Sequence, residues 1–172
     1  MAVALGSRHT VALDVPAQVT RTEDALRPRP AHLLIFLVLA MAAGSKHSLA
    51  LCSDGTVAGW GAGAMTGDGT NEERSLPVAV DASGALAGKR VVKIAAGENH
   101  SLVLCADGTL VAWGKNDFGQ LGDGGNLDSP VPVRVDPDGL LDGKTILGIA
   151  AGGNFNLVLC SDGTLEIGRA HV

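Results

Sequence analysis

Short runs of alternating apolar and small residues, separated by glycine-containing turns, recur along most of the chain. The clearest example spans residues 100–113, where HSLVLC and TLVAW flank Ala106-Asp107-Gly108. Asp-Gly accepts the positive φ of a tight turn, so this segment predicts a β-hairpin. Both faces of its first arm are apolar or small, with His100, Leu102 and Leu104 on one and Ser101, Val103 and Cys105 on the other. We therefore expect a sheet that is covered on both sides.

This hairpin belongs to a repeat that occurs three times. It reads GSKHSLALCSDGTVAGW from residue 44, GENHSLVLCADGTLVAW from residue 97 and GGNFNLVLCSDGTL from residue 152. A VVKI-type run precedes the hairpin and a PVPVRV-type run follows it, and Pro130 and Pro132 of the latter suit an edge strand. Each unit thus predicts four strands, and four-stranded units stacked radially form a β-propeller.

Composition agrees with a turn-rich repeat protein. Glycine supplies 24 of 172 residues, the net charge is −5, and no block of Lys and Arg could follow a phosphate backbone. We therefore expect no nucleic-acid partner. Cys52, Cys105 and Cys160 lie at one repeat position instead of at the spacing of a metal or redox site, so we interpret them as buried free thiols.

The recurring text resembles the repeats of the regulator of chromosome condensation family, including its bacterial and α-tubulin-suppressor-like members. The resemblance rests on the AAGxxHSLxLCxDGT run, on WGKNDFGQLGDG from residue 113 and on the following PVxV, and it covers about residues 38–165. It implies a propeller that usually has seven blades. For this chain we expect an all-β fold, an incomplete β-propeller with two nearly whole four-stranded blades plus the start of a third.

The repeats divide the chain into three regions. Residues 1–36 are an irregular leader or a degenerate repeat, since Gly6–Leu13 resembles Gly44–Leu51, and residues 37–165 hold the repeats. Residues 166–172 depart from the repeat, and we interpret this tail as an artefact without function.

An apolar run at residues 33–43 has two interpretations. It is too short to span a bilayer, so no transmembrane span is expected. We favour a first strand, because Val38–Ala43 aligns with the first strands of later repeats, and this agrees with a cytoplasmic protein. The alternative is a signal-peptide core at Leu33–Ala42, which would make the protein secreted.

Residues that could carry chemistry have structural interpretations in this pattern. Asp54, Asp107 and Asp162 each precede a turn glycine, where Asp is favoured for local backbone bonding. His47 and His100 share a repeat position that Phe155 occupies in the third unit, so we expect histidines held in blade packing or bonded to backbone. No nucleophile, base and orienting group recur together, and we expect neither catalysis nor a cofactor or metal.

Two polar loops are the candidate partner-binding residues: Asp68, Asn71 and Glu72 in one, and Asp123, Asn126 and Asp128 in the other. Their oxygen atoms could also suit calcium, but neither loop has the order of a calcium-binding loop. We expect a non-enzymatic module for protein–protein interaction. The alternatives are a nucleotide-exchange regulator of a small GTPase and a secreted or surface ligand-binding propeller. Open blade edges also allow self-association.

Overall fold

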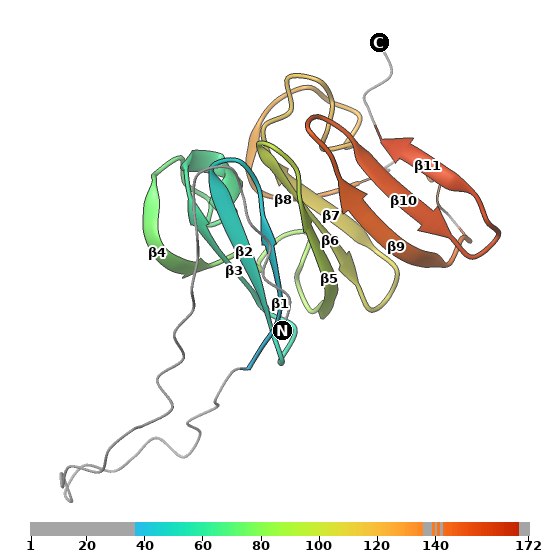
Figure 1. Ribbon diagram of the computed structural model, residues 1–172, viewed down its shortest axis with the longest axis horizontal. Helices are drawn as coiled ribbons and strands as arrows, with labels where there is room; N and C mark the ends of the chain where they lie inside the picture. Colours follow the sequence, from blue (N-terminus) through green and yellow to red (C-terminus); the bar gives the residue numbers. More distant parts are fainter. Residues whose placement is uncertain (1–36, 136–138, 140, 142, 169–172) are drawn as a thin grey trace, which may run out of the picture.

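The computed structural model describes residues 37–135, 139, 141 and 143–168, whose strands form three antiparallel sheets standing side by side (Figure 1). We call these sheets blades 1, 2 and 3. The first strand of blade 2 contacts the first strands of both neighbours, which places these three strands along one edge of the stack. Within the described ranges no helix has the length and apolar character needed to cross a membrane.

Each blade follows the chain order of its strands. Blade 1 contains β1 (Val38–Ala43), β2 (His47–Cys52), β3 (Val57–Gly61) and β4 (Arg74–Ala79). Blade 2 contains β5 (Val91–Ala96), β6 (His100–Cys105), β7 (Leu110–Gly114) and β8 (Ser129–Arg134). Blade 3 contains β9 (Ile146–Ala151), β10 (Asn156–Cys160) and β11 (Leu165–Gly168). Two four-stranded blades and a partial third confirm the predicted fold class.

Equivalent positions of the repeat pair with each other in all three blades. Ser48 pairs with Trp60 in blade 1, Ser101 with Trp113 in blade 2, and Asn156 with Gly168 in blade 3. Val38–Ala43 forms β1, so its strand interpretation holds, while residues 33–36 of the alternative signal core lie outside the described residues. The leader at residues 1–36 and the end of the tail at residues 169–172 also lie outside them.

Residues 166–168, the start of the tail assigned from the sequence, continue β11 and pair with β10, because strand pairing needs only main-chain groups. The loop after β3 contains a short 3₁₀ helix, η1 (Gly63–Thr66). Gly67 ends η1 with φ of 76°, a left-handed conformation that favours glycine.

The hairpin turns form as the Asp-Gly pairs predict. Gly55, Gly108 and Gly163 have φ of 87°, 86° and 82°. In each turn the preceding Asp accepts a hydrogen bond from the backbone N–H of the Thr two residues later, at 2.9–3.0 Å. The three recurring acids are therefore turn-forming residues.

Blade 2 is covered on both sides, as its two-faced pattern predicts. All six residues of β6 are buried, and β8 with its two prolines lies at the edge of the sheet. One core lies between blades 1 and 2 and includes Leu49, Leu51, Val103, Cys105 and Trp113. The other lies between blades 2 and 3 and includes Leu102, Leu104, Leu110, Val158 and Cys160. All three cysteines are free, but Cys52 is only half-buried, in contrast to the expectation.

Candidate functional site

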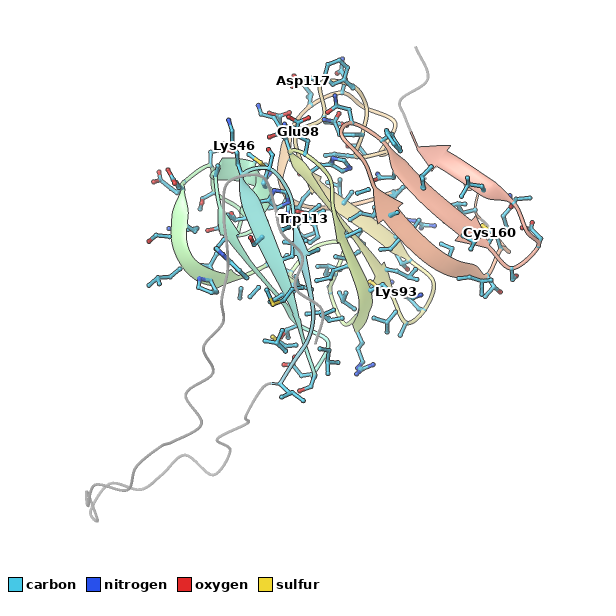
Figure 2. All side chains as sticks on the ribbon, viewed as in Figure 1. Lys46, Lys93, Glu98, Trp113, Asp117 and Cys160 are labelled. Carbon is cyan, nitrogen blue, oxygen red and sulfur yellow. The ribbon has the colours of Figure 1, made fainter. Side chains whose placement is uncertain are left out.

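A buried main-chain carbonyl takes part in joining blades 1 and 2. The Met65 carbonyl, in η1 of blade 1, accepts hydrogen bonds from Trp113 Nε1 at 3.0 Å and from Ser101 Oγ at 3.2 Å, both from blade 2. Trp113 is completely buried between the two blades (Figure 2). Two donors from one blade thus hold the 3₁₀ turn of its neighbour in a place without solvent.

A histidine extends this network. Ser101 Oγ also lies 3.0 Å from His47 Nε2. A serine hydroxyl has one proton, so when it donates to Met65 it can only accept from the histidine. The network therefore assigns the neutral tautomer with the proton on Nε2 to His47. The histidine thus acts as a donor across the junction.

The junction between blades 2 and 3 repeats this design with different residues. Asn156 Nδ2 donates to the Gln120 carbonyl at 2.6 Å, and Asn156 Oδ1 lies 2.9 Å from His100 Nε2, which donates to it. Gly168 occupies the place of Trp113 by register, so this junction has no tryptophan donor. The structure confirms that both histidines lie in blade packing. The hydrogen-bond partner of each histidine is a side chain of the next blade, Ser101 or Asn156, and not a backbone group.

Burial lowers the pKa of both histidines and so favours their uncharged forms. Burial, with a smaller effect of nearby His100, lowers the pKa of His47 to about 4. Burial also lowers the pKa of His100, against the opposing effect of the hydrogen bond that His100 donates to Asn156. Among the described contacts neither Nδ1 atom has a hydrogen-bond partner. Each ring lies on a glycine, Gly44 or Gly97, where a Cβ atom would overlap the imidazole.

The candidate loop of blade 1 is organised around Asp68. This carboxylate, whose side chain is 8% exposed, accepts from Arg74 Nε at 2.6 Å and from the backbone N–H of Thr70 at 3.0 Å. Burial alone would raise the pKa of Asp68, but hydrogen bonds from Thr70, Arg74 and Thr66 outweigh it and lower the pKa to about 2. Asp68 therefore shapes the loop, whose exposed polar residues include Asn71 and Glu72.

The candidate loop of blade 2 is organised around buried Asn116. Its amide nitrogen donates to Asp123 Oδ1 and to the Gly125 carbonyl, both at 3.1 Å, and its carbonyl oxygen accepts from the Leu121 N–H. Asp128 accepts from the Asn116 N–H at 2.9 Å and pairs with Lys115. Asp123 and Asp128 thus both accept hydrogen bonds from Asn116.

The two candidate loops are adjacent. The Gly69 N–H of blade 1 donates to the Pro130 carbonyl of blade 2 at 3.0 Å, directly after the second loop. Asp117, in the β7–β8 connection, lies at the same end of the molecule as Lys46 and Glu98 (Figure 2). We call residues 68–74 and 115–129 together the paired-loop surface.

Sequence reasoning missed the apolar residues of this surface. Phe118 is 62% and Leu127 is 79% exposed. Leu127 stands between Asn126 and Asp128, so an apolar residue inside a polar loop was the available signal. Phe118 gave a weaker signal, because the turn that contains it is closed by a side-chain contact, from the Phe118 N–H to Gln120 Oε1, that the sequence does not show.

Comparison with known proteins identifies the class of protein that this architecture represents, a β-propeller built from regulator of chromosome condensation (RCC1) repeats. Two family models with that description match, one at residues 38–65 and 91–120 and the other at residues 107–159. The chain belongs to the RCC1 repeat family.

Two relatives that the chain matches are much longer than the chain itself. The X-linked retinitis pigmentosa GTPase regulator homolog of Caenorhabditis elegans is 38% identical over 68% of the chain, which spans 8% of that protein. The human probable E3 ubiquitin-protein ligase HERC6 is 32% identical over 91% of the chain, which spans 17% of it.

Solved structures show the same fold. Human WBSCR16 matches 76% of the chain with a TM-score of 0.68 and 30% identity. Prp20p of Saccharomyces cerevisiae, described with its binding to Gsp1p and histones, matches 81% with a TM-score of 0.62 and 30% identity. The chain spans 32% of each of these structures.

We expect the stability of the protein to fall in mild acid because of His47. The folded-state pKa of about 4 lies below the ordinary value of 6.5, so between these values the unfolded chain binds more protons. The stability from this residue is present above pH 6.5 and is lost as the pH falls toward 4, by up to about 3 kcal/mol. Urea unfolding at several pH values measures the free energy of unfolding.

The matched variant for this prediction is His47→Phe, which copies the residue found at position 155. It should unfold with a shallower pH dependence than the wild type, because only the contribution of His100 then remains. Equal slopes in the two proteins would show that His47 does not titrate as its burial requires.

We expect Asp68 to stabilise the fold. Asp68→Ala removes an acceptor shared by four donors in and near the loop and should lower the free energy of unfolding by about 1–3 kcal/mol. Exposed Glu72 provides the control, because Glu72→Ala should change stability by less than about 0.5 kcal/mol. Equal, small effects in urea denaturation would contradict a structural role for Asp68.

Proposed function

We propose that this chain is a non-enzymatic protein-interaction module whose partner binds the paired-loop surface. The observation that carries the proposal is that Phe118 and Leu127 are exposed on loops held by internal hydrogen bonds. Exposed aromatic and aliphatic side chains on an ordered backbone are favourable anchors, since little conformational entropy is lost on binding.

The six candidate residues divide into two roles in this proposal. Asp68, Asp123 and Asp128 accept hydrogen bonds that hold the loop backbones. Asn71, Glu72 and Asn126 are exposed and supply the polar rim around the apolar anchors. The partner-binding surface therefore contains only part of the predicted set, with Phe118 and Leu127 added.

The named relatives support binding in place of chemistry. Prp20p is described with two protein partners, Gsp1p and histones, and it shares the propeller with this chain. The similarity to the ligase named HERC6 concerns only a small part of that protein, because the chain spans 17% of it. We propose no ligase activity for the repeats.

The double variant Phe118→Ser, Leu127→Ser tests the surface. It should lose capture of partner proteins from an extract of the source cells by about tenfold or more, the size expected when interface anchors are removed. Its urea midpoint should stay close to that of the wild type, because both side chains are exposed. The matched control is Leu76→Ser, which changes another exposed leucine in β4. An unchanged set and amount of captured proteins would refute the proposed surface.

A second candidate function is nucleotide-exchange regulation of a small GTPase. It is supported by the relative named as a GTPase regulator homolog and by Prp20p, described with Gsp1p. GDP release from Gsp1p in the presence of the chain distinguishes the candidates. Faster release favours exchange regulation, whereas an unchanged rate limits the proposal to binding.

A further inference from the structure

The exposure of the paired-loop surface is a property of the repeat. By repeat alignment, Leu127 of blade 2 corresponds to Glu72 of blade 1. Glu72 is exposed although the following blade stands beside its own, and Leu127 is exposed although the preceding blade does (Figure 1). A neighbouring blade on either side thus leaves this loop position open to solvent. An apolar residue at such a position is available to a partner.

The paired-loop surface also carries most of the net charge of the protein. It contains six carboxylates and two cationic side chains, a net charge of −4 in a chain of −5. Both cations are paired within the loops, Arg74 with Asp68 and Lys115 with Asp128. The cations of this surface are therefore held by its own acids, and the excess charge that it presents to a partner is negative.

Three exposed acids of this surface take no part in these salt bridges. Glu72, Glu73 and Asp117 form no ion pair among the residues that the structure describes. Lys46 and Glu98, at the same end of the molecule (Figure 2), add one charge of each sign and leave the balance negative. The apolar anchors thus lie on loops whose unpaired charges have one sign. Such loops attract cationic partners and repel anionic ones.

We propose that the partner of the paired-loop surface is a cationic protein segment, in which Lys or Arg residues stand beside an apolar side chain. This inference rests on the proposed function and adds to it the chemistry of the partner. The apolar side chain of the segment packs against Phe118 and Leu127, and its cations lie over the unpaired acids. The same acids repel nucleic acids and anionic lipid surfaces.

Selection of displayed random peptides on the immobilised whole chain tests this chemistry. We expect the enriched peptides to carry Lys or Arg near an aromatic or aliphatic residue, and acidic peptides to be depleted. The most enriched peptide is then synthesised and used as the probe in surface plasmon resonance. Its association rate should fall as NaCl is raised, because charges at the rim of a contact act mainly on association and are screened by salt.

The double variant Glu72→Gln, Asp117→Asn removes one unpaired charge from each loop and keeps the size of both side chains. It should slow association of the probe by about tenfold at low salt and leave its dissociation rate nearly unchanged. The matched control is Asp54→Asn, Asp162→Asn, which removes two exposed charges at hairpin turns, at the other end of the strands. The control should change association by less than about twofold.

The variant Phe118→Ser, Leu127→Ser separates this inference from the proposed function, because loss of apolar anchors should speed dissociation of the probe. Enriched peptides without Lys or Arg that this variant no longer binds would refute the cationic partner alone, as would a probe whose association the Glu72 and Asp117 variant does not slow. Peptides that bind the Phe118 and Leu127 variant as well as the wild type would refute the surface itself, and this inference with it.

Discussion

The Met65 carbonyl is the point on which the described structure depends, because it accepts two side-chain donors from the neighbouring sheet inside the buried junction of blades 1 and 2. It receives Trp113 Nε1 and Ser101 Oγ in a buried place, and Ser101 in turn fixes the tautomer of His47. A buried carbonyl without donors is costly, so these bonds specify one relative placement of blades 1 and 2. Apolar packing alone tolerates several placements.

That placement also produces the paired-loop surface. The carbonyl lies in η1, which leads directly into the loop of Asp68, and Gly69 of this loop bonds to Pro130 of blade 2. The junction therefore sets the distance between the loops of adjacent blades. Exposed residues on them can act as one surface because the buried network below holds both.

Much of this architecture follows from the sequence, because the pattern of each strand and turn occurs in more than one repeat. Asp-Gly pairs, two-faced strands and edge prolines predicted the blades. The contacts at the junction could not be predicted in this way, since the pairing of a histidine with a serine of the next blade depends on the distance between the sheets. The repeat does mark the exceptions: Phe155 replaces a histidine and Gly168 replaces a tryptophan, and both change the third blade.

The loops show what the sequence alone does not resolve about a candidate site. A polar loop sequence does not separate an acid that binds a partner from one that holds the backbone, and Asp68 accepts a hydrogen bond from the backbone N–H of Thr70. Buried Asn116, two residues before exposed Phe118, donates to Asp123 and Gly125, which lie several positions further along the chain. Such contacts form only after the loop closes.

The most direct test of the junction is a double-mutant cycle of Ser101→Ala and Trp113→Phe, with the free energy of unfolding measured in urea. Each variant removes one of the two donors that blade 2 gives to Met65. The account predicts that the double variant loses about 1 kcal/mol more than the sum of the single losses, because the buried carbonyl then loses both donors. Losses that add within a few tenths of a kcal/mol would contradict a junction fastened at this carbonyl.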